Sequence, residues 1–264
     1  MSLCTSRLVW ALLLVAPAAM PCDARGGTPP IRASLAASVS GFRPGEPFDV
    51  AIRLEADRGW HTYWMNPGEA GLATTVRWTL PEGFTAGPLR WPAPKRFVTG
   101  GIVSFGYDGV TLLPVEIRPP EDWPTGRVAT LRARVDWLGC REECVPGGAD
   151  VEVALPAARS TAASDGADAV LRAIAALPRS DSRLRVAARA VKGGIAVRLE
   201  GTGASVPDGF FPVAGGVLRA SPAPVWTRTG GGIHETVLAL EAGVPAPPRM
   251  AGVLTFGGPG ARTP

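Results

Sequence analysis

Two cysteines, Cys140 and Cys144, carry the clearest potential for chemistry in this chain of 264 residues. They are the only cysteines after position 22. A strand-like run leads into Cys140, and the Pro-Gly-Gly sequence at 146–148 predicts a turn after Cys144. At a turn or a hairpin end, the Cα atoms of such a pair come within the roughly 4.4–6.8 Å that a disulfide spans. We therefore expect a short-range disulfide here.

The short spacing leaves two interpretations of this disulfide open. A bond that encloses so few residues removes little entropy from the unfolded chain, so its contribution to stability is small. That favours a redox switch over a structural staple. Arg141 would favour a thiolate, whereas Glu142 and Glu143 would oppose it. A static disulfide fits the same spacing equally well.

Residues 1–24 have the form of a secretory signal peptide, with Arg7 before an apolar run from Leu8 to Met20 and small residues at the cleavage sites. This run is shorter than the roughly 20 residues that span a membrane. No later segment is apolar enough to span one. Cys22 follows a proline, which does not suit a lipoprotein site. We predict an exported protein with no membrane span in the mature chain, in a compartment that permits disulfides.

The composition indicates an all-β protein. The 33 glycines and 27 prolines stand mostly between short apolar runs, as in a many-stranded fold with frequent turns. The net charge is +4 without any block of Lys or Arg, which excludes a nucleic-acid surface. We find no Ser-His-Asp arrangement, phosphate loop or telling carboxylate pair, and we assign no cofactor.

Residues 26–156 contain about eight short strand patterns with turn signals every 8–12 residues, which predicts an immunoglobulin-like β-sandwich. In the segment 60–64, His61 and Tyr63 are expected on one strand face, with the tryptophans on the other. The segment 127–137 is expected to be a long strand with a buried set of Val128, Leu131, Ala133, Val135 and Trp137.

The second half of the chain predicts a linker with one short helix and then a smaller domain. Residues 157–179 contain the linker and a capped helix that begins near Ser164 and ends before Pro178. Residues 180–258 alternate in short runs and predict a second, smaller β-sandwich. Residues 259–264 are expected to be a tail.

Four segments occur in an order that resembles a known family: Trp60–Gly68, Trp91–Pro94, Phe105–Val115 and Asp136–Gly147. Together they resemble the periplasmic N-terminal domain of DsbD-type thiol:disulfide interchange proteins, in particular the ScsB-like branch associated with suppression of copper sensitivity. The resemblance covers about residues 30–156, and the second half fits the same branch more loosely.

The resemblance implies a Cys140/Cys144 pair that cycles between dithiol and disulfide. It implies that electrons come from a membrane thiol reductase and pass to oxidised, thioredoxin-like periplasmic proteins. By the family pattern, Cys144 would form the mixed disulfide and Cys140 would resolve it. Relatives with a longer cysteine gap leave this assignment open. Because longer relatives continue into a transmembrane carrier and this chain ends at Pro264, we expect either a separate membrane reductase or a truncated gene.

The resemblance also implies an aromatic cap over the pair. Phe97, on an expected loop at 95–104, is the first candidate and Phe105 the second; an ordinary packing role is the alternative. By analogy with the family, His61 and Tyr63 are expected to shape the site; the pattern by itself favours the alternative, a histidine satisfied on a sheet face.

Two functions are therefore compared. The first is a periplasmic thiol:disulfide exchange module. The alternative is a non-catalytic β-sandwich adaptor or copper-handling protein with a structural disulfide. Cys140, Cys144, His61 and Met65 are ligand types that Cu(I) accepts, but nothing in their spacing makes them converge, so we assign no metal. Reduction potential separates the two, since structural disulfides lie below about −300 mV.

Overall fold

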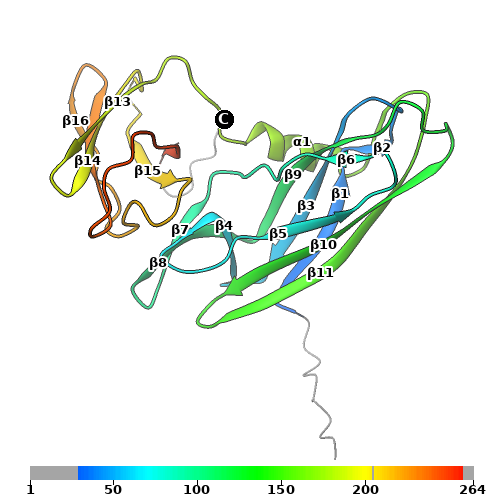
Figure 1. Cartoon of the computed structure of the whole chain (residues 1–264), viewed down its shortest axis with the longest axis horizontal. Helices are drawn as coiled ribbons and strands as arrows, with labels where there is room; N and C mark the ends of the chain where they lie inside the picture. Colours follow the sequence, from blue (N-terminus) through cyan, green and yellow to red (C-terminus); the bar gives the residue numbers. More distant parts are fainter. Residues whose placement is uncertain (1–28, 204, 258–264) are drawn as a thin grey trace, which may run out of the picture.

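The computed structural model describes residues 29–203 and 205–257, and its all-β architecture confirms the predicted fold class (Figure 1). Two antiparallel sheets form an N-terminal sandwich. A C-terminal unit, which runs from β13 to β18, lies at one end of it. The predicted signal peptide, residues 1–24, and the predicted tail, residues 259–264, lie outside the described residues. The nine-residue helix α1 within the described part is too short to cross a membrane.

The first sheet of the sandwich has the strand order β1-β3-β9-β6. Its strands are β1 (Ile31–Ala37), β3 (Phe48–Ala56), β9 (Val110–Arg118) and β6 (Thr85–Ala86). The second sheet has the order β11-β10-β4-β8-β7, and β5 also pairs with β10. Its strands are β11 (Cys144–Pro156), β10 (Val128–Cys140), β4 (His61–Gly68), β8 (Ile102–Asp108), β7 (Lys95–Thr99) and β5 (Thr75–Thr79).

The core lies between these sheets and follows from the period-two pattern of the strands. Every second residue of β10 is buried, in the set Ala129, Leu131, Ala133, Val135 and Trp137. The expectation that Val128 belongs to this set was wrong, because it is one position out of phase and 53% exposed. Ala133, Val135 and Trp137 share a cluster with residues of the first sheet that include Ile52, Leu54 and Leu113. Ala129 and Leu131 share another with Val50, Val115 and Ile117.

The Pro-Gly-Gly sequence at 146–148 does not form the turn that its composition predicts. It continues β11, and Pro146 pairs with Leu138 of β10. Because β11 lies at the edge of the sheet, the missing N–H of a proline is tolerated there. Gly147 lies against the ring of Trp137, where an added Cβ would come within 2.5 Å of Nε1. The hairpin turn is formed instead by residues 141–143.

The second sheet has a seam along β10. Strand β5 pairs with the middle of β10, from Arg132 to Asp136. Strand β4 pairs with β10 only at its end, through Cys140 and His61. The group β4-β8-β7 therefore joins the β10–β11 hairpin at one residue pair, and Figure 1 shows this group between the hairpin and the C-terminal unit.

A short linker connects the two parts of the chain. Strand β12 (Ala162–Ala163) pairs with β2 (Val39–Gly41), and helix α1 (Ala167–Ala175) then lies against β1, β3 and β9. The helix has no side-chain cap: Gly166 occupies the N-cap position, and the Ser164 hydroxyl donates to the Ala37 carbonyl. Ser164 therefore ties the linker to the sandwich instead of capping the helix.

The C-terminal unit contains two further sheets. One has the order β13-β14-β17-β16, and the other pairs β15 with β18. The strands are β13 (Arg185–Val191), β14 (Gly194–Glu200), β15 (Pro207–Pro212), β16 (Thr227–Gly230), β17 (Ile233–Ala239) and β18 (Gly252–Phe256). A small core of Ile195, Val197, Leu218 and Leu238 lies within it.

Phe211 of β15 joins the core of the N-terminal sandwich. Its ring lies edge-on to Phe105 at 5.1 Å and to Trp64 at 6.3 Å between centroids, and it is 6% exposed. Such pairs contribute beyond their buried area. The two parts of the molecule thus share one apolar core across their interface.

We predict that Phe211→Ala destabilises the whole molecule by about 3–5 kcal/mol, the usual cost of removing a buried phenylalanine. Urea unfolding followed by tryptophan fluorescence measures this loss. Phe210→Ala is the matched control, because Phe210 is half-buried and packs within the C-terminal unit. Equal losses in the two variants would contradict a shared core.

Candidate functional site

The two cysteines close the β10–β11 hairpin. Cys140 is the last residue of β10 and Cys144 the first of β11; they are direct cross-strand partners and form a disulfide with Cα atoms 4.2 Å apart. Cys140 is 5% exposed, whereas Cys144 is exposed to solvent. Cys144 is therefore the solvent-facing residue of the pair, and Cys140 is the shielded one.

The hairpin turn is anchored beside the disulfide. The guanidinium of Arg141 lies 5.8 Å from the centre of the Trp60 ring, and its side chain runs along Gly59. The backbone N–H of Arg141 donates to the Glu143 carbonyl at 3.3 Å. These contacts hold the turn against the segment that precedes β4, so the disulfide stays next to that strand.

Strand register determines which side chains surround the disulfide. Cys140 lies directly opposite His61, and partners in an antiparallel pair project to the same face. His61 and Tyr63 therefore project to the outer face of the sheet with Cys140, while Thr62 and Trp64 project inward. This is the alternation that the sequence predicts for the segment 60–64.

Tyr63 makes the direct polar contact with the disulfide. Its hydroxyl lies 3.3 Å from Sγ of Cys144, and because a disulfide sulfur carries no proton, the phenol is the donor. The ring is 3% exposed, and burial raises its pKa, so the hydroxyl keeps its proton. Gly71, at φ +120°, lies on this ring, where a Cβ would come within 2.1 Å of a ring carbon.

The rings of Tyr63, His61 and Phe97 form an aromatic wall beside the disulfide, and His61 is its middle member. It is 4% exposed, stacks on Phe97 at 4.3 Å and lies edge-on to Tyr63 at 5.3 Å between ring centres. Its Nε2 is 3.5 Å from the Ser104 hydroxyl. Burial lowers the pKa of His61, and nearby Asp108 opposes this only in part, so the ring is neutral at pH 7.

Phe97 belongs to the site because its ring stacks on His61. The expected cap loop at 95–104 is a β-hairpin formed by β7 and β8, with its tip at Gly100–Gly101. Phe97 is half-buried and pairs with Ser104, so its ring covers the imidazole on the outer face. The cap candidate therefore lies on a sheet strand, and its rigidity depends on what holds β7.

Phe105 lies on the other face of the same hairpin. It pairs with Arg96, is 2% exposed and packs against Phe211. The structure does not bring Phe105 to the disulfide; it places this ring in the core between the two parts of the molecule. Neighbouring residues of a strand project to opposite faces, and this separates Phe105 from Ser104.

Sequence reasoning missed three contributors to the site, namely Gly71, Ser104 and Asp108. Each is distant from the cysteines in sequence and comes to the site only through strand register or loop packing. Their one visible signal is position: all lie in segments next to the aromatic strand or the hairpin 95–108. Within residues 29–203 and 205–257, no three His, Cys, Asp or Glu side chains gather into a cluster suited to a metal ion.

Residues 30–156 match the family described as the N-terminal domain of the thiol:disulfide interchange protein DsbD. Among solved structures, the N-terminal periplasmic domain of ScsB from Proteus mirabilis superposes with a TM-score of 0.61 at 19% identity, covering 86% of this chain and 87% of that one. That likeness supports the fold. A variant of BcpA, the major pilin subunit of Bacillus cereus, matches at a TM-score of 0.31 and 10% identity over 48% and 40% of the chains. No curated protein sequence matches the chain.

We predict that His61 makes stability depend on pH. Because burial lowers its pKa in the fold, the unfolded chain takes up a proton first, near its ordinary pKa of about 6.5. The contribution of His61 to stability is then complete above that pH and is lost as the pH falls below it toward the folded pKa. Urea unfolding at pH 7.5 and pH 5.0 measures this loss.

The matched control for this prediction is His61→Phe, which keeps an aromatic ring against Phe97 and removes the titrating group. Its free energy of unfolding should fall less between the two pH values than that of the wild type. Parallel curves for the two proteins would show that His61 does not carry the effect.

Proposed function

Residues 30–156 are a domain of the DsbD N-terminal family, and from this premise we propose that Cys140 and Cys144 form a redox-active pair that exchanges thiols and disulfides with other proteins. The observation that carries the proposal is the asymmetry of the pair. Cys144 is open to an incoming thiolate and accepts a hydrogen bond from buried Tyr63, while Cys140 is shielded behind it.

The exchange proceeds by two displacements at sulfur. A thiolate of a reducing partner attacks Sγ of Cys144 in line, the disulfide breaks, and Cys140 leaves as a thiolate that takes up a proton. A second thiolate of the partner then attacks the mixed disulfide and releases Cys144. Two electrons and two protons have passed to this protein, and the partner holds a new disulfide. The reverse sequence reduces an oxidised acceptor.

Tyr63 has a defined role in these steps. Its hydroxyl already lies at hydrogen-bond distance from Sγ of Cys144 in the disulfide. When Cys144 becomes a thiolate, the same O–H donates to a charged sulfur, and such hydrogen bonds are stronger than those to neutral groups. The hydrogen bond therefore stabilises the charged form and lowers the pKa of the Cys144 thiol.

The family and the sequence together suggest where this exchange occurs. We place the protein in the periplasm, where disulfides persist. A membrane-bound thiol reductase is the proposed electron donor, and thioredoxin-like periplasmic proteins are the proposed acceptors. In this cycle Cys144 forms the mixed disulfide with either partner. The second thiol of the donor resolves the first mixed disulfide, and Cys140 resolves the one formed with the acceptor.

We predict that Cys140→Ser traps partners through Cys144, because the mixed disulfide then lacks its resolving thiol. Non-reducing electrophoresis of a periplasmic extract, followed by mass spectrometry of the trapped species, measures this. Cys144→Ser is the matched control and should trap much less, since Cys140 is 5% exposed. If neither variant traps a protein, the exchange function loses its support.

We also predict that Tyr63→Phe raises the pKa of the Cys144 thiol by about one unit, as expected for losing a hydrogen bond to a charged group. The pH dependence of iodoacetamide alkylation of Cys144, measured in a Cys140→Ser background, reports this pKa. Tyr107→Phe is the matched control, because the Tyr107 hydroxyl donates to the Pro92 carbonyl instead. An equal thiol pKa in both variants would remove Tyr63 from the mechanism.

A further inference from the structure

The C-terminal unit holds β4 at a buried asparagine. Asn66, on β4 three residues after Tyr63, is 4% exposed. Its Nδ2 donates to the Pro212 carbonyl at 2.7 Å and lies 3.4 Å from the Ala214 carbonyl, while its Oδ1 accepts from the Gly68 N–H at 3.1 Å. The side chain thus fixes the bulged end of β4 to the end of β15.

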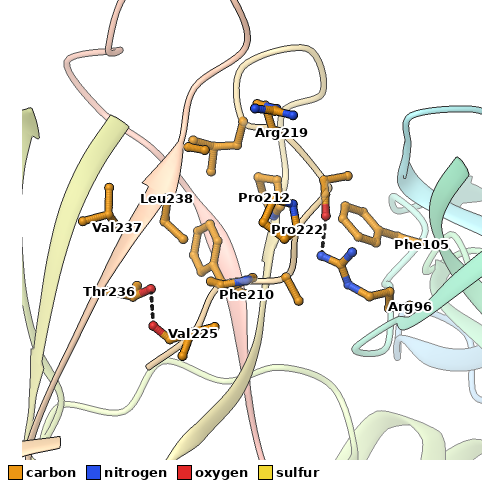
Figure 2. Close-up of a pocket in the computed structure, with 15 residues that line it drawn as sticks. Arg96, Phe105, Phe210, Pro212, Arg219, Pro222, Val225, Thr236, Val237 and Leu238 are labelled. Atoms are coloured by element: carbon orange, nitrogen blue, oxygen red, sulfur yellow. Dashed lines mark hydrogen bonds between the residues drawn. The ribbon is translucent and has the colours of Figure 1, made fainter. Parts of the chain in front are cut away.

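The same unit holds β7 at Arg96. The Arg96 guanidinium donates to the Ala220 carbonyl and lies 5.6 Å from the centre of the Phe105 ring. Figure 2 shows Arg96 and Phe105 reaching from the sandwich toward Pro222 of the C-terminal unit. We call the contacts of Asn66 and Arg96 with the C-terminal unit the clamp. Arg96 precedes Phe97 in the strand, so the Arg96 contact lies on one face of β7 and the Phe97 ring lies on the other.

These two contacts fall on the strand group β4-β8-β7, which joins the rest of its sheet at a single residue pair. In the described sheet, β7 pairs with one strand, β8, and β4 meets β10 at the single pair of Cys140 and His61. A cavity of about 260 Å³, lined by Arg96, Phe105, Phe210 and Pro222 among others, remains beside the Arg96 contact. The two parts of the molecule are therefore not fully packed against each other beside Arg96.

We propose that the C-terminal unit is a positioning domain for the disulfide: through Asn66 and Arg96 it holds the aromatic wall of His61, Tyr63 and Phe97 closed beside Cys140. Release of the clamp lets β4 and β7 move away from the hairpin and opens Cys140 to solvent. Cys144 is already exposed, so this movement does not change its access to solvent; it only takes the Tyr63 hydroxyl away from the Cys144 sulfur.

The consequence for exchange rests on the function proposed above, whereas the shielding itself does not. While the clamp is closed, a partner thiolate meets Cys144 and not Cys140, so the order of the two displacements is fixed. The freed Cys140 thiol is also kept from oxidants until it resolves the mixed disulfide. Asn66 and Arg96 are positioning residues in this scheme, since neither belongs to the group that contacts the reacting sulfur.

The test measures alkylation of Cys140 in a Cys144→Ser background, with the modified peptide identified by mass spectrometry. Arg96→Met and Asn66→Ala should each raise the alkylation rate of Cys140 about tenfold, as expected when a hydrogen bond that holds the closed form is lost. Arg132→Met is the matched control: it breaks an exposed pair with Glu152 on the same sheet, away from the interface, and should leave the rate unchanged.

A second readout separates positioning from general loss of structure. In a Cys140→Ser background, at a pH where the Cys144 thiol is fully ionised and the Tyr63 hydrogen bond no longer sets its thiolate fraction, the same variants should leave the alkylation rate of Cys144 at the wild-type value. Circular dichroism should show the native fold. If Asn66→Ala does not fold, Arg96→Met, which keeps an apolar stem beside Phe105, decides alone. Unchanged Cys140 rates, or equal acceleration of both thiols, would overturn the proposal.

The two proposals fail separately. If the Cys140→Ser variant traps no partner but Arg96→Met still accelerates alkylation of Cys140, the exchange function is wrong and the positioning role stands. If trapping succeeds and the alkylation rates do not change, the pair is redox-active without control by the C-terminal unit.

Discussion

The pairing of Cys140 with His61 is the constraint on which the rest of the site depends. It is the one residue pair that joins β4 to β10, and it sets the register between these two strands. From that register follow the shared outer face and the contact of Tyr63 with Cys144, while the pairing of β4 with β8 and of β8 with β7 places Phe97 on His61. A slip of one residue would turn both aromatic side chains inward and leave the disulfide without neighbours.

Burial favours the uncharged form of both ionisable neighbours of the disulfide. It lowers the pKa of His61 and raises the pKa of Tyr63, so both are uncharged at neutral pH. The disulfide thus lies beside a neutral ring and a protonated phenol. A thiolate formed at Cys144 would be the new charge in this wall, and the Tyr63 hydroxyl is placed to donate to it. At neutral pH, the charge beside these two rings therefore changes when the disulfide is reduced.

The sequence predicts the strands and the cysteine pair well, because period-two alternation and cysteine spacing are local signals. It fails at Val128, which has a strand former's side chain but lies out of phase with its strand. It also fails at Pro146, since an edge strand accepts turn-forming residues. The local sequence does not distinguish Phe97 from Phe105 as the aromatic cap. Only strand pairing places Phe97 near His61 and Phe105 in the core. The contacts of Asn66 and Arg96 join distant segments and leave no local signal.

The shared core explains why the cover of the site involves both parts of the chain. A strand group joined to its sheet at one residue pair has little to resist its movement, because most stability of a strand comes from its neighbours and its buried face. Phe211 supplies the missing buried contact behind β8, and Asn66 and Arg96 supply the polar ones. Since these contacts come from the C-terminal unit and the disulfide lies on the opposite face, a partner can reach Cys144 without disturbing them. Access to the buried sulfur is then governed by an interface that the partner does not touch.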